Sequence, residues 1–142
     1  MPSVVALKRI VEDEGILCPI EFQDLPFKPQ RIFYVFNVPR GETRGKHAHY
    51  NTQQMLVCLK GIIEVHLFDG IDTYNKVLFP SEYIFVDKLV WDSQTYLTGE
   101  ELMISVCSTP YNPDDYIHDL EEFKRVVNTL DRNGKRDKET NI

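Results

Sequence analysis

The sequence predicts an all-β fold, an antiparallel barrel or sandwich, followed by one C-terminal α-helix. Short segments rich in β-branched and aromatic residues recur along the chain, and turn signals such as Lys60-Gly61 and Asp69-Gly70 separate them. Many short strands with a turn roughly every 8–12 residues are typical of sandwiches and barrels. Beyond Asn112 the apolar residues take helical spacing instead.

Individual strands follow from the pattern in each segment. Residues 31–38 are β-branched and aromatic, and they predict a strand buried on both faces. Residues 54–60 form a second apolar run, and residues 63–67 alternate between apolar and polar side chains, which is the period of a half-buried strand. Further short strands are expected at 74–79, 83–86 and 102–107.

The closing helix has a start signal and an apolar stripe. Asn112 is a suitable N-cap, and Pro113 suits the first helical position. The residues of the stripe are Tyr116, Leu120, Phe123 and Val127. Their spacing of four, three and four residues places them on one helical face, which we expect to pack on the barrel.

Length, charge and cysteine content narrow the range of functions. The net charge of −6 disfavours nucleic-acid binding, which needs a broad basic face. No apolar run approaches the roughly 20 residues of a membrane helix, and the N-terminus lacks a signal-peptide pattern, so a cytoplasmic protein with no membrane partner is expected. The three cysteines argue against a disulfide framework. Residues 1–130 are expected to form one domain, and residues 131–142 a polar tail.

The stretch around His47 and His49 carries the most functional information. Residues two apart on a strand point to the same side, so both imidazoles share a face. Such a pair suits either a metal site or acid–base chemistry. The nearby cationic residues are Arg31, Arg40, Arg44 and Lys46. In an acidic chain, this local positive charge favours a small anionic ligand.

The spacing of Gly41, His47, His49, Gln54 and Gly61 matches the first motif of the cupin superfamily, which the chain resembles. The resemblance implies a jelly-roll barrel. Metal-binding cupins carry Glu at the position of Gln54, and their second motif supplies a third His, which residues 69–95 lack. Two neutral imidazoles without these ligands form a poor site for iron, manganese or zinc, so we expect neither a metal nor another cofactor.

A more specific resemblance rests on four segments in order. They are Arg31-Ile-Phe-Tyr-Val-Phe, Arg44-Gly-Lys-His-Ala-His, Gln54-Met-Leu-Val-Cys-Leu-Lys-Gly and Asp114-Asp-Tyr-Ile-His-Asp-Leu-Glu-Glu-Phe. From about residue 7 to 125 the chain resembles the dTDP-4-keto-6-deoxyglucose 3,4-ketoisomerases, metal-free cupins of the WxcM-like group. The resemblance implies that a dTDP-linked 4-keto-6-deoxyhexose is the substrate, whose ketone moves from C4 to C3 through an enediol(ate). It also implies a role in making 3-amino-3,6-dideoxy sugars for surface polysaccharide, and a homodimer, often with exchanged strands.

The resemblance also implies roles for individual residues. His49 would be the main base at C3, and His47 would assist as an acid or proton shuttle. Tyr34 would bind a sugar oxygen or stabilise the enediolate, although it could equally be a core residue. Arg44, and after it Arg31, would bind the diphosphate through their forks of donors; Arg31 could instead only hold the sheet together.

Gln54 and Trp91 complete the expected substrate-binding set, with wall packing as the alternative for Trp91. His66 is expected on the strand after Gly61, and His118 on the C-terminal helix.

Two positions depart from the family pattern. Glu14 stands where the family often has Arg, and Asp92 follows Trp91 where the family often has His. Two other functions stay open at this point. One is a sugar-nucleotide 3,5-epimerase of the related cupins, and the other is a cupin that binds a sugar nucleotide without catalysis.

Overall fold

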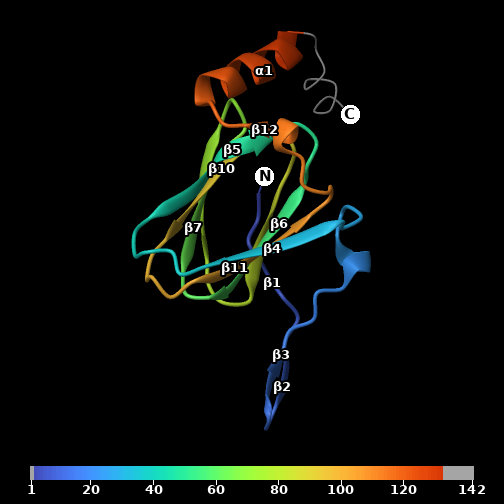
Figure 1. Cartoon of the computed structure of the whole chain (residues 1–142). Helices are drawn as coiled ribbons and strands as arrows, with labels where there is room; N and C mark the ends of the chain where they lie inside the picture. Colours follow the sequence, from blue (N-terminus) through green and yellow to red (C-terminus); the bar gives the residue numbers. More distant parts are fainter. Residues whose placement is uncertain (1, 133–142) are drawn as a thin grey trace.

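Two five-stranded antiparallel sheets face each other across the core of the computed structural model, which describes residues 2–132 (Figure 1). The first sheet contains, in spatial order, β1 (Val5–Ala6), β9 (Glu82–Val86), β6 (Gln54–Lys60), β11 (Leu102–Cys107) and β4 (Arg31–Phe36). The second contains β12 (Tyr116–Ile117), β5 (Thr43–His49), β10 (Trp91–Tyr96), β7 (Ile63–Phe68) and β8 (Thr73–Leu78). The predicted all-β barrel is therefore confirmed.

The core lies between the inner faces of the two sheets. Leu56 and Met103 reach it from the first sheet, and Ile63, Leu78 and Tyr96 reach it from the second; each is at most 2% exposed. Alternate residues of each strand point inward, as the two-residue period of a pleated strand requires.

Each sheet is also covered on part of its outer face. Met55 and Val57 of β6 pack under the N-terminal segment that carries Leu7 and Phe27. On the second sheet, the helix α1 (Leu120–Arg132) packs its Phe123 and Val127 side chains on Ala48 and Ile117. Figure 1 shows α1 lying across the end of the barrel where β5 and β12 meet.

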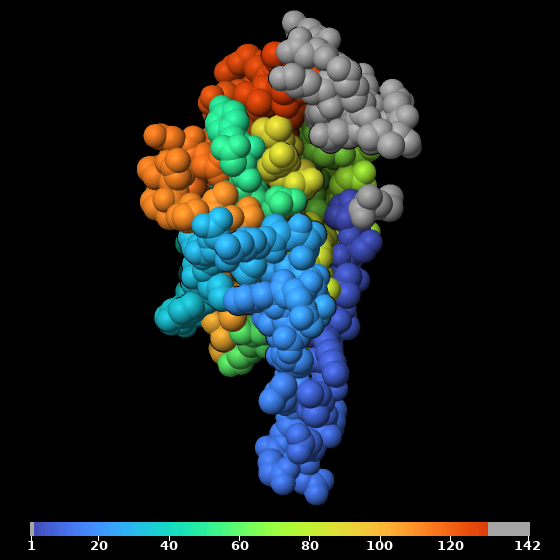
Figure 2. Space-filling model, turned by 90° about the vertical axis from the view of Figure 1, so that its right-hand side faces the viewer, coloured from blue at the N-terminus to red at the C-terminus, as the bar shows by residue number. Residues whose placement is uncertain are grey.

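A hairpin of β2 (Ile10–Glu12) and β3 (Gly15–Leu17) projects from the barrel, and the short helix η1 (Phe22–Asp24) follows it (Figures 1 and 2). Its apolar side chains are exposed, with Val11 at 70% and Leu17 at 57%. An isolated two-stranded hairpin is at best marginally stable in water.

The predicted strands at 54–60, 63–67, 74–79, 83–86 and 102–107 are confirmed to within a residue or two at their ends. The prediction that residues 31–38 are buried on both faces is wrong. Phe33 and Val35 face the core, whereas Ile32, Tyr34 and Phe36 are all more than half exposed. The reason is that β4 is an edge strand whose outer face nothing in the described chain covers.

The predicted start of the helix is also wrong. Asn112 accepts a hydrogen bond from the Asp114 amide at 3.0 Å, but it caps only the short helix η2 (Pro113–Asp115). The chain then forms strand β12 and begins α1 at Leu120, where Asp119 accepts from the Glu122 amide. Local cap signals are genuine here, but pairing with β5 outcompetes continuation of the helix.

The predicted polar tail, residues 131–142, lies outside the described residues except at 131 and 132, where the backbone continues α1. No helix within residues 2–132 is long and apolar enough to span a membrane.

Candidate active site

A bulge in β5 places Arg44, His47 and His49 on the same inner face of the second sheet. Arg44 pairs with Gln94 and His47 pairs with Asp92, so Lys46 is the extra residue of this strand. Lys46 has a φ of +63°, the left-handed conformation that bulges use. Without the inserted residue, Arg44 and His47 would point to opposite faces. Ala48 faces outward, toward α1.

Strand β12 adds two more rings beside the histidine pair. Tyr116 pairs with His49, and its ring centroid lies 4.4 Å from that of His49 and 5.1 Å from that of His47. His118 stacks parallel to Tyr116 at 5.4 Å and lies 6.0 Å from His47. The Tyr116 ring thus touches all three imidazoles. The histidine expected on the helix lies at the site instead.

Asp115 holds β12 against the end of β5. Its carboxylate accepts hydrogen bonds from the Asn51 amide at 2.8 Å, from the Asn51 side chain at 3.1 Å, and from the Thr52 hydroxyl. Its carbonyl accepts from the Tyr50 amide at 2.9 Å. These bonds fix a strand of two residues that has little pairing of its own, and they thereby position Tyr116.

The two imidazoles of β5 are neutral at physiological pH. Burial lowers the pKa of His47 to about 4, with a further contribution from His118. Burial also lowers the pKa of His49 to about 4, together with His47 and the positive charge of Arg31, while Asp115 opposes the shift. A neutral imidazole has a free lone pair, which a general base requires.

Arg31 begins β4, and its positive charge acts on His49. Its guanidinium carbon sits 5.6 Å from the Tyr111 ring centroid, and that ring lies 5.9 Å from Tyr116. The Arg31 side chain therefore borders the ring cluster of His47, His49, Tyr116 and His118. Arg44 borders the same interior, since its charge opposes the burial that raises the pKa of Tyr96 to about 12.

Three buried side-chain atoms within residues 2–132 have no hydrogen-bond partner: Arg31 Nε, His49 Nε2 and Asp92 Oδ2. Buried polar atoms are nearly always paired in folded proteins, so each exception needs an explanation. Here all three belong to residues of this inner face or its border. The shared location indicates a site whose polar groups are kept for a ligand.

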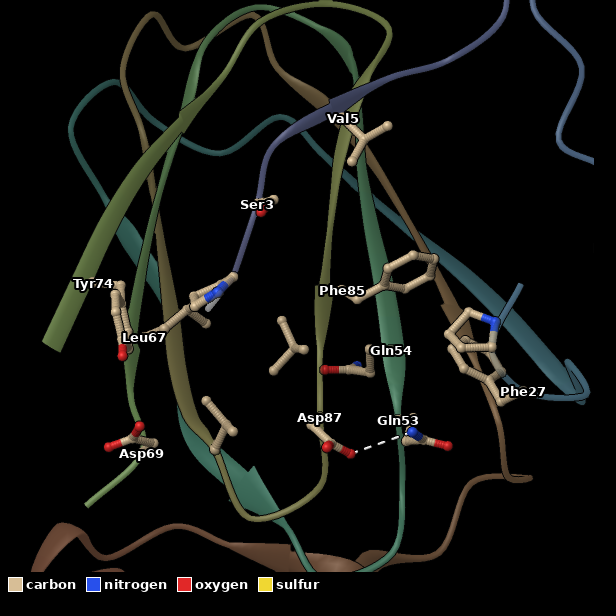
Figure 3. Close-up of a pocket in the computed structure, with 14 residues that line it drawn as sticks. Ser3, Val5, Phe27, Gln53, Gln54, Leu67, Asp69, Tyr74, Phe85 and Asp87 are labelled. Carbon is tan, nitrogen blue, oxygen red and sulfur yellow. Dashed lines mark hydrogen bonds between the residues drawn. The ribbon is translucent and has the colours of Figure 1, made fainter. Parts of the chain in front are cut away.

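Gln54 lies in the barrel interior, where its amide donates to the Ser105 hydroxyl at 3.2 Å. It also lines a cavity of about 520 Å³ that opens beside the N-terminal residues, with Phe27, Phe85 and Tyr74 in its wall (Figure 3). The ring cluster does not line this cavity. Gln54 is thus the predicted site residue that lines this cavity.

The structure does not bring Tyr34 and Trp91 to the histidines. The Tyr34 ring is 64% exposed on the outer face of β4 and stacks on Phe36 at 5.7 Å. The Trp91 ring faces α1, 5.8 Å from Phe123. Both positions follow from strand parity, because the neighbouring residues Phe33 and Asp92 take the inward places.

No group of three metal-ligating side chains converges anywhere in residues 2–132. Although His118 supplies a third imidazole, the Tyr116 ring lies among the three histidines and contacts each of them. This arrangement favours proton transfer, which needs separate donors and acceptors around one substrate.

A two-sheet antiparallel barrel with paired imidazoles on an inner strand is the architecture of a cupin-type protein. The chain belongs to the FdtA family, described as WxcM-like, C-terminal, whose model matches residues 2–128.

Named relatives agree with this assignment. The chain is 32% identical over 127 residues to the TDP-4-oxo-6-deoxy-alpha-D-glucose-3,4-oxoisomerase of Aneurinibacillus thermoaerophilus, covering 88% of this chain and 91% of the relative. Two solved structures are each 28% identical in sequence to this chain. A 3,4-ketoisomerase from Helicobacter canadensis has a TM-score of 0.85, covering 89% of this chain and 97% of that one. The sugar 3,4-ketoisomerase QdtA of Thermoanaerobacterium thermosaccharolyticum, in complex with TDP, has a TM-score of 0.84. The match covers 90% of this chain and 95% of that one.

Proposed function

We propose that this protein is a 3,4-ketoisomerase that acts on a dTDP-linked 4-keto-6-deoxyhexose, moving the ketone from C4 to C3. The observation that carries the proposal is the pair of neutral, inward-facing imidazoles of His47 and His49, beside buried polar atoms that lack partners. Family membership and the TDP bound to a structural neighbour support the substrate class.

The reaction is a pair of coupled proton transfers. His49, whose buried Nε2 has no partner in the protein, takes the acidic proton from C3, and the electrons move to the oxygen at C4. His47 gives a proton to that oxygen, and an enediol forms. The hydroxyl at C3 then returns a proton to His47 while C4 gains one from His49, so both histidines end as they began. Each step leaves the substrate with the atoms it began with.

The remaining side chains bind and orient the substrate. Arg31 and Arg44 border the site from two strands and supply the donors for the diphosphate. Tyr116, rather than Tyr34, places a phenol against both imidazoles, where it can donate to a sugar oxygen. Gln54 contributes an amide from the interior.

Incubation with the 4-keto sugar nucleotide in D₂O tests the proposal. We expect NMR to show deuterium in the ring and a 3-keto product, with unchanged turnover after exhaustive EDTA treatment. No deuterium incorporation would exclude catalysis and leave a binding protein. Deuterium at C3 and C5 with the ketone still at C4 would show a 3,5-epimerase instead.

We also propose that the protein acts as a homodimer in the cytoplasm, with strands exchanged between the subunits. The exposed apolar residues of β4, Ile32, Tyr34 and Phe36, support a partner surface, as does the projecting hairpin. The three free cysteines fit a reducing compartment. Light scattering coupled to size exclusion should give twice the chain mass of 16.6 kDa; a monomeric mass would refute the dimer.

A further inference from the structure

The carboxyl group of Asp92 is a buried titratable group opposite His47 that the proposed reaction has not used. Its side chain is fully buried, at 0% exposure. Oδ1 accepts a hydrogen bond from Gln94 Nε2 at 2.9 Å, whereas Oδ2 has no partner. A buried carboxyl with one unpaired oxygen is costly, so its presence requires an explanation beyond stability.

The register of the sheet places this carboxyl beside His47. Asp92 of β10 and His47 of β5 are directly opposite each other, so their side chains share the inner face. Cross-strand partners have Cβ atoms about 4.5–5.5 Å apart, a separation that the two side chains can bridge with one hydrogen bond. The bulge at Lys46 creates this pairing, since it shifts His47 into register with Asp92.

The groups around Asp92 leave it without a cation of its own. From β5 it faces His47, and from β7 its paired neighbour is the apolar Leu67. On its own strand Tyr96 faces the same interior, and the charge of Arg44 acts on that phenol. The inward polar residues of the opposite sheet are Arg31, Gln54, Ser105 and Cys107, and none of them bonds the Asp92 carboxyl. Burial accordingly raises the pKa of Asp92 to about 7, and the bond from Gln94 offsets only part of this rise.

We propose that Asp92 holds the proton that His47 delivers: through His47 it protonates the oxygen at C4 and later takes back the proton of the hydroxyl at C3. The inference rests on the proposed ketoisomerase function and deepens it. In the first step the carboxyl proton passes to one nitrogen of His47 while the other nitrogen gives its proton to the C4 oxygen.

His47 stays neutral throughout this relay, which suits an imidazole whose buried position disfavours its charged form. The new carboxylate is balanced by the imidazolium that His49 forms on taking the C3 proton. In the second step the C3 hydroxyl proton returns through His47 to Asp92, and His49 gives its proton to C4. Asp92 is fully buried, so it acts through His47 and positions the proton rather than touching the sugar.

The pH profile of Asp92→Asn tests the relay. Wild-type turnover should fall above about pH 7, where the carboxyl of Asp92 ionises. The variant keeps an acceptor for Gln94 but holds no transferable proton, so we expect kcat to drop about a hundredfold and this alkaline limb to disappear. Glu101→Gln is the control, because it makes the same kind of change at the buried carboxyl that bonds the Ile62 and Gly99 amides. It should keep the alkaline limb of the pH profile. An unchanged limb in an active Asp92→Asn enzyme would overturn the relay.

A second measurement separates the relay from a structural role. In D₂O, Asp92→Asn should still exchange the C3 proton through His49 while transferring the ketone slowly, so the ratio of exchange to isomerisation should rise. A parallel loss of both would contradict the relay. If the variant does not fold, carboxyl ¹³C NMR of the wild type decides: one aspartate should titrate near pH 7, and its absence refutes the relay. Inactivity of the wild type on the 4-keto sugar would instead refute the proposed function.

Discussion

Two of the buried carboxyl groups of the barrel, Glu101 and Asp92, have opposite surroundings. Glu101, 2% exposed, accepts hydrogen bonds from the backbone amides of Ile62 at 2.9 Å, Thr98 at 3.0 Å and Gly99 at 2.9 Å, and from the Thr98 hydroxyl. Asp92 has one hydrogen bond and one bare oxygen. One carboxyl ties two turns together, whereas the other is left incomplete beside the histidines.

The difference also reverses the direction of the pKa shift. Burial alone would raise the pKa of Glu101, but its hydrogen bonds from Thr98, Ile62 and Gly99 outweigh burial and lower the pKa. Burial raises the pKa of Asp92 to about 7, because the single bond from Gln94 cannot compensate. A fold can thus satisfy a buried carboxylate where it serves structure, and an unsatisfied one points to chemistry.

The largest expected effect on kcat is at the histidine pair, which shares the inner face with Asp92. His49→Asn should lower kcat about a thousandfold, because a positioned general base contributes roughly 10²–10⁴ in rate. Binding of dTDP, measured by calorimetry, should change little. The control is His66→Asn on the outer face, where His66 bonds Asn75 and Thr95, and it should keep turnover. Loss of folding in His49→Asn would indicate a structural histidine.

The pH dependence of stability should distinguish the two carboxyls next. The folded state of the wild type holds the Asp92 proton up to about pH 7, whereas the unfolded chain releases it near 3.8, so Asp92 costs stability progressively as the pH rises between these values. Asp92→Asn removes this cost. Its free energy of unfolding relative to wild type should therefore increase from pH 4 to pH 7, by at most about 4 kcal/mol.

His47 and His49 change stability with pH in the direction opposite to Asp92. Their lowered pKa values of about 4 mean that stability is lost as the pH falls from 6.5 toward 4. Both histidines are present in the wild type and in Asp92→Asn, so their contribution cancels in the difference between denaturant melts. A flat difference across this pH range would show that Asp92 ionises normally.

The carboxyl of Glu101 should contribute to the free energy of unfolding and not to turnover. Glu101→Ala leaves the amides of Ile62, Thr98 and Gly99 without their acceptor, and we expect a loss of about 3 kcal/mol. Its exposed neighbour is the matched control, because Glu100→Ala breaks only a surface ion pair with Lys60 and should cost under about 1 kcal/mol. Turnover per folded molecule should stay unchanged in both; a changed kcat in Glu101→Ala would connect this turn to the site.

The strands and the shared face of His47 and His49 could be predicted from the sequence because both follow from a local two-residue period. Contacts distant in sequence decide what covers a face, so the local pattern of β4 does not predict its exposed side. The bulge at Lys46 breaks the period without a composition signal, apart from the adjacent Gly45. The sequence predicts helix where strand β12 lies, because Tyr116 satisfies a helical spacing as well as it satisfies pairing with β5.

The position of β12 leads to the smallest predicted effect on kcat, and it decides which tyrosine belongs to the active site. The sequence assigns the active-site phenol to Tyr34, whereas the structure brings Tyr116 against both imidazoles. Tyr116→Phe keeps the ring packing and removes one hydrogen-bond donor. We therefore expect kcat to fall about tenfold, which corresponds to a rise of about 1.4 kcal/mol in the activation free energy. Tyr34→Phe should leave kcat unchanged if a single chain forms the site. The reverse result would mean that Tyr34 reaches the site of a second subunit across the exposed face of β4, and that the phenol of Tyr116 only packs.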